Sequence, residues 1–372
     1  MLKILYVTNN TGFCRFYRCQ FPAQYMSMSG EAQVQFIDPV DINLLNKTCK
    51  WADIIVFQHG VAAQYIIALS KLIKNLKLPQ LIVVEYDDNL IESHPMNVGA
   101  YFYWGTQEIY GKNGNAIWKD GMSKFSIAAN MERIQTMIEA NKQADLITVT
   151  TPQLAEAFNY VKDKVEAIPN FINPSVMPIR NDLVYSSNVT KIIWQGGDSH
   201  YADLALMMPA LKKIKDIWGD KVEFYLWGIS YRSLGQNIGA KFIPWSTPEL
   251  FFPHFSEHHF DIGIIPIEDN KFNHGKSNIK WLEYSYYSIP SVVQNNFPYK
   301  QHIEDYETGL LFDTQQDFFD GINTLIKDPI LRMKIAANAR AKVLKDYNIE
   351  TKYHLWLECY KKHLKKKIAS YT

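Results

Sequence analysis

The sequence predicts an α/β protein built from two doubly wound domains that face each other across a central cleft. Its 372 residues are about twice the length of a typical domain, which favours two domains with separate cores. In both halves, short apolar runs alternate with stretches of helical period, a pattern typical of βαβ units and parallel sheets. A segment rich in proline, serine and asparagine separates the halves.

The first half contains five apolar runs that predict buried strands. In order they are KILYV, VQFI, DIIVFQ, LIVVEY and LITVT. Helical stretches are expected at residues 15–28, 62–77 and 125–142, between these runs. Both faces of a parallel sheet are covered by helices, so its strands are expected to be apolar along their whole length.

The second half repeats the alternation. Its strand-like runs are KIIWQG, KVEFYLW, KFIPW, DIGIIPI, SVVQN and GLLF. Helices are expected at residues 201–217, from residue 248, and in the segment that follows DIGIIPI. Three further helical stretches follow GLLF, and the last of them reads NIETKYHLWLECYKKHLKKK.

The proline-rich segment at residues 168–190 has the composition of an exposed hinge, and it places a domain boundary near Ile179. The predicted units are residues 1–178, residues 179–350, and a C-terminal helix with a basic tail at residues 351–372. Residues 92–124 combine glycines with aromatic residues and fit neither the strand nor the helix period. A connection of this length favours a functional loop.

The composition excludes several classes of protein. The formal net charge is +1, so the whole chain has no general attraction to nucleic acid or to anionic membranes. No apolar run approaches the ~18 residues that span a bilayer, and the N-terminal apolar stretch is too short for a signal peptide. The four cysteines show no paired-ligand spacing, which favours ordinary thiols in a reducing cytoplasm.

The segment KFNHGKSNIKWLEYSYYSIPSVV, residues 271–293, passes from a polar loop into an aromatic-rich helix and then a strand. Lys276, Ser277 and Asn278 stand at the start of this helix. Unpaired N–H groups and the helix dipole favour anions there, and a lysine adds a full positive charge, so the segment suits a phosphate group. The alternative is that Ser277 only caps the helix while Lys276 is solvated.

Glu283 lies in an apolar part of the same helix, where a carboxylate needs hydrogen-bond partners. Sugar hydroxyls are natural partners, and an internal hydrogen bond is the alternative. Gly196 and Gly197 follow a strand and precede a helix, so they can bring backbone close to a ligand or form an ordinary turn. Gly12 follows the first strand, but no dinucleotide or P-loop fingerprint is present.

Two other groups could bind metal. Asp87 and Asp88 follow the strand LIVVEY, where paired carboxylates can hold a divalent ion, accept a proton, or simply form a turn. His254 and His258 have the i, i+4 spacing of a helical metal pair, but a third ligand is not evident nearby.

Taken together, these motifs resemble the family-4 retaining glycosyltransferases of the GT-B architecture, in particular their bacterial and bacteriophage members. The resemblance rests on ADLITVTTPQLAEAF with VEAIPNFIN in the first half, and on DIGIIPIEDNKFNHGKSNIKWLEYSYYSIPSVV with ETGLLF in the second. FYRCQFPAQYM and VVEYDDNL resemble the first domain of the same subgroup. The match extends over most of the chain.

The resemblance implies a nucleotide-diphospho-sugar donor bound by the second domain and an acceptor bound by the first. Glu283 matches the second Glu of the family's E-x7-E pair, which binds the nucleotide ribose, whereas Gly275 stands in place of the first. The donor site would comprise Gly12, Gly196, Gly197, His200, Pro244, Trp245, Lys276, Ser277, Asn278 and Glu283. His200 is the only cation that the sequence offers where the family has an Arg/Lys pair.

The resemblance also implies retaining transfer by front-face attack, with Glu283, Lys276 and Asp88 as the catalytic residues. The leaving diphosphate helps to deprotonate the acceptor, and no protein nucleophile is required. The resemblance also implies that no metal or other cofactor is required, since metal is not usually needed in this architecture. The acceptor contacts would be Arg15, Arg18, Asp87 and Asp88, and the C-terminal helix would cross back to the first domain.

The acceptor is expected to be a surface glycan or a lipid-linked saccharide. One alternative is a hydroxymethylated base in phage DNA, and another is a non-catalytic nucleotide-sugar-binding protein. The tail KKHLKKK could bring the protein to an anionic membrane or to DNA through Lys361, Lys362, Lys365, Lys366 and Lys367. Solvated lysines at a helix C-terminus are the alternative.

Overall fold

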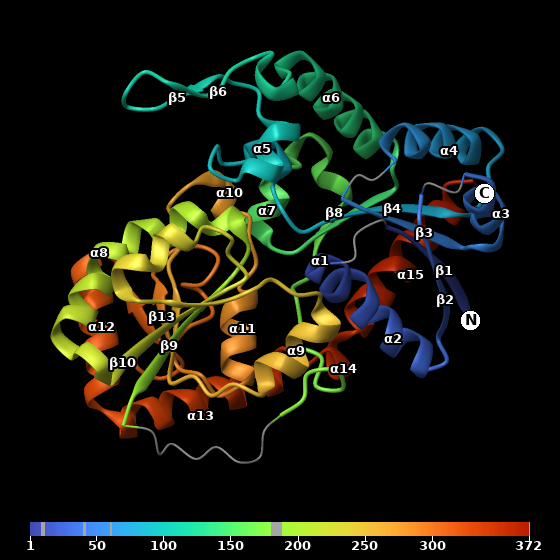
Figure 1. Ribbon diagram of the computed structural model, residues 1–372. Coiled ribbons are helices and arrows are strands. Elements are labelled where there is room, and N and C mark those ends of the chain that lie inside the picture. The colour runs from blue at the N-terminus through green and yellow to red at the C-terminus, as the bar shows by residue number, and fades with distance from the viewer. Residues whose placement is uncertain (9–11, 40–41, 60–61, 180–187, 372) are drawn as a thin grey trace.

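The chain folds around two six-stranded sheets in which every strand pair is parallel (Figure 1). The computed structural model describes residues 1–8, 12–39, 42–59, 62–179 and 188–371. Part of the predicted hinge, residues 180–187, therefore lies outside the described residues. The predicted α/β architecture with two doubly wound domains is confirmed.

The first sheet has the strand order β2-β1-β3-β4-β7-β8. Its strands are β1 (Leu2–Val7), β2 (Ala32–Ile37), β3 (Ile54–Gln58), β4 (Leu81–Tyr86), β7 (Leu146–Val149) and β8 (Val165–Ala167). The five predicted strands are present, and β4 is buried along its whole length, as expected for a sheet covered on both faces. No apolar run of the sequence predicts β8, which has only three residues.

Helices cover this sheet on both sides. They are α1 (Phe13–Arg15), η1 (Phe16–Gln20), α2 (Phe21–Met28), α3 (Ile42–Trp51), α4 (Ala63–Asn75), α6 (Ile127–Gln143), α7 (Pro152–Glu156) and η4 (Asn159–Lys164). The η1 segment is a π-helical turn inside the predicted helix, and its consecutive residues Tyr17, Arg18 and Cys19 are all buried. Such turns often occur at functional sites, and this one directs two polar side chains into the protein.

The long insertion has its own small core. It contains η2 (Leu90–Glu92), α5 (Val98–Trp104), the hairpin strands β5 (Ile109–Tyr110) and β6 (Ala116–Trp118), and η3 (Met122–Lys124). Tyr101, Trp118 and Phe125 form its buried cluster. In Figure 1 the hairpin projects from the top of the molecule. The predicted loop is therefore a folded arm.

The second sheet has the order β11-β10-β9-β12-β13-β14. Its strands are β9 (Thr190–Gln195), β10 (Val222–Trp227), β11 (Lys241–Ile243), β12 (Ile262–Ile265), β13 (Ser291–Gln294) and β14 (Leu310–Phe312). Its helices are η5 (Asp198–His200), α8 (Tyr201–Trp218), η6 (Gly219–Lys221), η7 (Arg232–Ile238), α9 (Pro248–Ser256), α10 (Lys271–His274), α11 (Ile279–Tyr286), α12 (Gln315–Lys327) and α13 (Pro329–Asp346).

The chain ends with α14 (Ile349–Lys352) and α15 (His354–Ala369). The red helix α15 in Figure 1 lies against the blue α2 and also contacts β4, so the C-terminal helix returns to the first domain as predicted. Trp356 and Tyr360 anchor it and are fully buried. Burying two aromatic side chains of this size contributes several kcal/mol, about 25 cal/mol for each Å² of apolar surface.

A single apolar core joins the two domains. Alternate residues of β1 belong to different clusters: Ile4 and Tyr6 face one side of the first sheet, and Leu5 and Val7 face the other. The cluster that contains Ile4 also contains Ile193 of β9 and Phe251 of α9. The two domains therefore share one continuous cluster of buried apolar side chains.

Candidate active site

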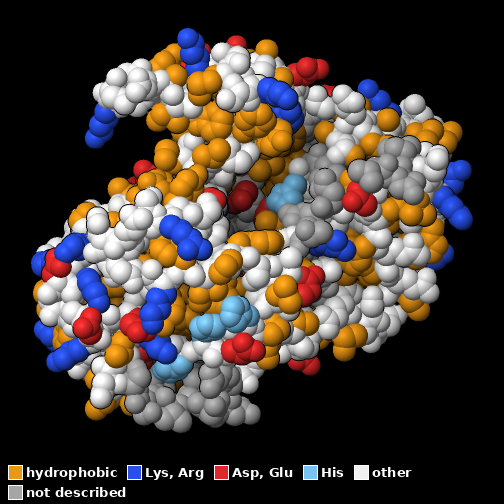
Figure 2. All heavy atoms as spheres, viewed as in Figure 1, with side chains coloured by type: hydrophobic (Ala, Val, Ile, Leu, Met, Phe, Trp, Pro, Cys, Tyr) orange, Lys and Arg blue, Asp and Glu red, His pale blue; other side chains and the backbone are white. Residues whose placement is uncertain are grey.

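A cavity of about 280 Å³ lies between the two domains, lined by residues that follow strands of both sheets. Ligands of open parallel sheets bind at this edge, where loops and helix N-termini converge. Figure 2 shows a hollow between the two halves of the molecule, with acidic and histidine side chains visible inside it. The cavity brings together Arg18, Asp87, Asp88, Gly196, Gly197, His200, Trp245, Lys276, Ser277 and Glu283.

The other predicted site residues do not line the cavity. Gly12 forms the N-cap position of α1. The guanidinium of Arg15 lies over the ring of Phe36 at 5.1 Å. Pro244 is exposed beside Trp245, and Asn278 is buried behind the cavity wall. These four residues therefore do not line the cavity, and the donor or acceptor contacts predicted for them stay predictions.

Glu283 is buried and bonded by one residue from each domain. Tyr17 donates from η1 to Oε1 at 2.6 Å, and the Gln195 amide donates from the end of β9 to Oε2 at 2.5 Å. Burial raises the pKa of Glu283 to about 7, although these two donors and Lys280 act in the opposite direction. The carboxyl group therefore changes charge near neutral pH.

Lys280 is the principal site residue that the sequence reading missed. It lies on α11, it is buried, and it lines the cavity. Burial, and next the charge of Lys276, lower the pKa of its ammonium to about 7. The sequence did contain a signal, because Lys280 is a second lysine close to the predicted helix start; Lys276 precedes α11 and Lys280 lies in its first turn.

His200 is held neutral beside Lys280. Burial, followed by the charges of Lys280 and Lys276, lowers the pKa of His200 to about 3. Its Nδ1 lies 2.6 Å from Asp203, and its Nε2 lies 2.9 Å from the Lys280 ammonium. The imidazole thus accepts from the ammonium and orients it, so Lys276 and Lys280 supply the positive charge that the sequence assigned to His200.

Gly196 leaves room for the Lys280 side chain. A Cβ atom on Gly196 would lie 3.2 Å from Cε of Lys280 and 3.0 Å from the ring of Trp194. Its φ of 157° also lies at the limit of what other residues adopt. A side chain at Gly196 would therefore push against the lysine and Trp194, and the glycine backbone lines the cavity.

The start of α11 is not capped by the side chains of Ser277 and Asn278. Asn278 occupies the N-cap position but makes no side-chain cap bond. The hydroxyl of Ser277 accepts from Asn170 of the first domain at 2.9 Å. The side chains of Ser277 and Asn278 therefore leave the first turn of α11 uncapped.

Gly275 is packed against the first domain. A Cβ atom at this position would lie 3.3 Å from Leu154 and 3.4 Å from Asn89, and the Gly275 carbonyl accepts from Thr151. The glycine adopts an ordinary right-handed backbone conformation. The close approach of the two domains therefore explains the absence of a larger residue here.

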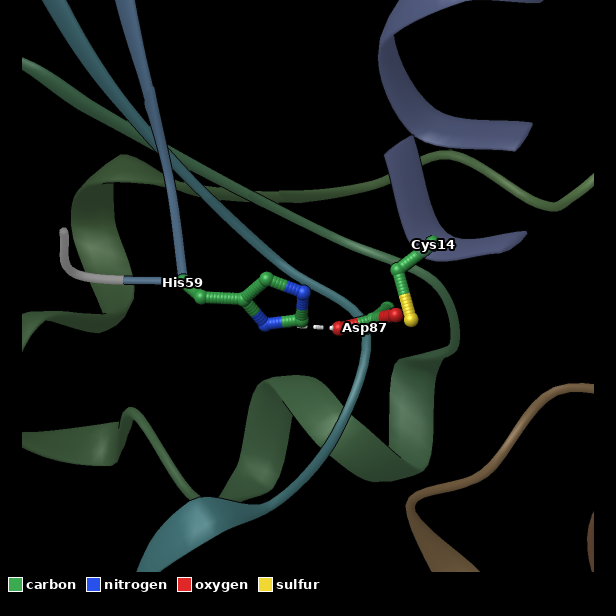
Figure 3. Close-up of side chains that lie close together, drawn as sticks. All are labelled: Cys14, His59 and Asp87. Carbon is green, nitrogen blue, oxygen red and sulfur yellow. Dashed lines mark ion pairs between the residues drawn. The ribbon is translucent and has the colours of Figure 1, made fainter. Parts of the chain in front are cut away.

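Asp88 and Asp87 belong to the first-domain wall of the cavity. Asp88 forms an ion pair of 3.3 Å with Lys276, across the two domains. Asp87 lies beside His59 and Cys14 (Figure 3), two residues that the sequence reading did not assign to the site. Burial alone would raise the pKa of Asp87, but His59, Cys14 and Arg18 outweigh it and lower the pKa to about 2.

Arg18 has a structural role. Its Nε donates to Glu85 at 2.7 Å, and its remaining nitrogens donate to two backbone carbonyls and to Asn170. Both Arg18 and Glu85 are fully buried. Arg18 also touches the cavity, and its acceptor contact stays a prediction beside the four hydrogen bonds that it donates within the protein.

The basic tail is partly neutralised by the first domain. Lys361 pairs with Glu31, Lys362 with Glu166 and Lys367 with Asp145. These contacts hold α15 in place. Lys365 and Lys366 are exposed, and a contact of this helix with a membrane or DNA stays a prediction that would use these two residues. None of the described helices has the length and apolar character needed to cross a bilayer.

Comparisons with known proteins agree with this architecture. A family model described as glycosyl transferase-like matches residues 205–358, which include Lys276, Lys280 and Glu283. A sequence comparison with curated proteins gives no significant match.

Several solved structures match almost the whole chain. Sucrose-phosphate synthase from Thermosynechococcus elongatus matches with a TM-score of 0.65 and 13% identity, over 97% of this chain and 99% of that one. HepE from Anabaena, in complex with UDP and glucose, matches at 0.63 and 13%, over 96% and 99%. A glycosyltransferase from Rickettsia africae matches at 0.59 and 16%, over 98% and 99%. The chain therefore has the GT-B fold, and the fold together with the family model supports a glycosyltransferase function.

Proposed function

We propose that the protein is a retaining glycosyltransferase that moves a sugar from a nucleotide-diphospho-sugar to an acceptor hydroxyl. The observation that carries the proposal is the convergence of two lysines and one buried carboxylate, Lys276, Lys280 and Glu283, on the cavity between the domains. Two cations suit a diphosphate, and a carboxylate suits the hydroxyls of a ribose.

The diphosphate would lie between the two lysines and the first turn of α11. Lys276 and Lys280 offer ammonium groups, and the uncapped start of the helix offers backbone N–H groups. Gly196 and Gly197 allow the backbone after β9 to approach the same group. These ammonium and N–H groups are in place before the nucleotide sugar binds. They can therefore stabilise the negative charge that grows on the leaving diphosphate.

Glu283 would bind the ribose. Each carboxylate oxygen accepts one hydrogen bond in the structure, and an ionised carboxylate has about four acceptor positions in all. A pair of ribose hydroxyls can therefore be added without displacing Tyr17 or Gln195. The exposed ring of Trp245 lines the cavity at a position where a nucleobase could stack.

The reaction would follow the front-face route of retaining transfer. The acceptor oxygen bonds to the anomeric carbon on the side where the bond to the diphosphate breaks, so no protein nucleophile is needed. The leaving diphosphate takes up the acceptor proton, so no protein base is needed, and the two lysines would hold it without a metal. The protein supplies orientation and electrostatic stabilisation. Asp88, paired with Lys276, stands where it could orient an acceptor hydroxyl. Recognition of the transferred sugar would fall to residues other than Gly275.

The acceptor we propose is a surface glycan or a lipid-linked saccharide. A hydroxymethylated base in DNA is a second candidate, because the folded arm has two half-exposed tyrosines, Tyr103 and Tyr110, that could stack on bases. Cytoplasmic location is proposed for either acceptor.

A screen of nucleotide sugars by thermal shift and by hydrolysis tests the proposal, with both kinds of acceptor added to the donors that bind. Lys276→Ala and Glu283→Ala should each weaken donor binding by more than about tenfold, since each removes a charged contact. Lys271→Ala is the matched control, because Lys271 lies in the same segment but is highly exposed. Normal donor affinity in both site variants would exclude this site.

The anomeric configuration of the product, read by NMR, separates retention from inversion. Tight donor binding without hydrolysis or transfer would instead support a non-catalytic nucleotide-sugar-binding protein.

A further inference from the structure

Three side chains that can bind metal ions meet on the first domain. Cys14, His59 and Asp87 come after β1, β3 and β4, which are neighbours in the sheet. The carboxyl ends of these strands bring the three residues to the same edge, although they are far apart in the sequence. Their candidate ligand atoms all lie within 4.8 Å of one another (Figure 3).

We propose that Cys14, His59 and Asp87 bind a divalent transition-metal ion, with zinc as the best fit. A thiolate, an imidazole and a carboxylate together suit zinc, whereas magnesium and calcium prefer oxygen ligands. In a tetrahedral zinc site the ligand atoms lie roughly 3 to 4 Å apart, as bond lengths of about 2.0 to 2.3 Å require. Small shifts reach this geometry: His59 Nδ1 and Asp87 Oδ1, now 2.9 Å apart, must separate slightly.

The three side chains already contact one another, so a cation would replace these contacts. His59 Nδ1 lies 2.9 Å from Oδ1 of Asp87, and a bound cation would take the place of the proton between these two atoms. His59 also has a left-handed backbone, with φ of 55°, which is strained for a residue with a side chain. Such strain is kept where surrounding structure fixes it, often at functional sites.

The site would open on the cavity. Cys14 and Asp87 both line the cavity, and Asp88 next to them pairs with Lys276. Three protein ligands leave a fourth position free, the arrangement found in zinc sites that bind water or a substrate. The fourth ligand would be an oxygen, from water or from an acceptor hydroxyl. This inference goes beyond the proposed function, since the donor contacts use none of the three ligands.

Cobalt binding tests the proposal, because a cobalt–thiolate bond gives a charge-transfer band in the near ultraviolet. Full-length protein freed of metal with a chelator is titrated with Co²⁺, followed by Zn²⁺. We expect one Co²⁺ per chain, with a charge-transfer band that Zn²⁺ abolishes. Cys14→Ser should lose this band, whereas Cys49→Ser should keep it, because Cys49 is a buried thiol of the same domain outside the cluster.

His59→Gln gives a second measurement that keeps the thiol. It should weaken Co²⁺ binding by more than about tenfold, and it carries the test if circular dichroism shows that Cys14→Ser does not fold. Any one of three results would overturn the proposal. The native protein could lack the charge-transfer band, the band could persist in Cys14→Ser, or His59→Gln could bind Co²⁺ with unchanged affinity. These measurements need neither donor nor acceptor, so their outcome is independent of the proposed transfer reaction.

Discussion

Lys280 is expected to take up a proton when a diphosphate binds. Its pKa of about 7 leaves it roughly half charged at neutral pH. A negative charge placed about 4 Å away stabilises the ammonium by about 4 kcal/mol at an effective dielectric constant of about 20. This energy corresponds to roughly three pKa units, so Lys280 would stay charged in the complex to about pH 10.

Donor affinity should therefore fall as the pH rises through 7. Only the molecules with a charged Lys280 bind well, and the apparent Kd is the intrinsic Kd divided by their fraction. With a pKa of about 7, this fraction falls from about nine-tenths at pH 6 to about one-tenth at pH 8. The loss of charge on Lys280 alone thus raises the apparent Kd about tenfold between pH 6 and pH 8.

Calorimetry with a nucleotide sugar such as UDP-glucose measures both the affinity and the proton uptake. A nucleotide sugar is a better probe than UDP, whose terminal phosphate itself titrates near pH 6. Titrations in two buffers of different ionisation enthalpy should give an uptake near one proton per donor at pH 8.

Lys280→Arg is the control, because arginine stays charged throughout this range. Both proteins keep Glu283, which also titrates near pH 7, so the ratio of their Kd values removes most of the Glu283 contribution. The effect of the Lys280 charge on the pKa of Glu283 stays in the ratio. A ratio that is constant from pH 6 to pH 8 would refute the assignment of the diphosphate to Lys280.

Three other substitutions test the surrounding structure. Burial raises the pKa of Glu283 in the folded protein from 4.5 to about 7, so the native protein loses stability as the pH rises through 7. Glutamine has no such titration. In chemical denaturation, the free energy of unfolding of Glu283→Gln should therefore rise by about 3 kcal/mol relative to that of the native protein between pH 4 and pH 8. Arg18→Met leaves Glu85 buried without its ion pair and should lower the free energy of unfolding by about 3 to 5 kcal/mol, with partial recovery on adding Glu85→Gln. Gly275→Glu places a side chain against Leu154 and should cost about 1 to 3 kcal/mol, whereas unchanged stability would mean that the domains can separate at this point.

Much of the fold could be predicted because buried parallel strands are apolar along their whole length. LIVVEY and DIGIIPI stand out from their surroundings for this reason, and both form central strands. The short edge strand β8 and the helix α3 do not stand out. The π-helical turn η1 depends on tertiary packing, which sequence periodicity does not report.

The part of the cavity wall that α11 and the turn before it supply could be predicted, because its residues are close together in one segment. Lys276 and Glu283 were identified from the helix start and from the cost of burying a carboxylate. The cluster of Cys14 and His59 with Asp87 could not be found in this way, since it depends on the order of β1, β3 and β4 in the sheet. Spacing along the chain carries no such information.

The donor segment is also part of the contact between the domains. Lys276 pairs with Asp88, the hydroxyl of Ser277 accepts from Asn170, and Glu283 accepts from Tyr17. All three partners belong to the first domain, so each contact would break or lengthen if the domains moved apart.

A bound donor would compete for some of these same groups. The Lys276 ammonium can approach a diphosphate more closely only by weakening its ion pair with Asp88. The carboxylate of Glu283, by contrast, can accept ribose hydroxyls while it keeps the hydrogen bond from Tyr17. Donor binding should therefore release Asp88 towards the acceptor side of the cavity while Glu283 and Tyr17 still hold the domains together, which couples donor binding to the preparation of the acceptor site.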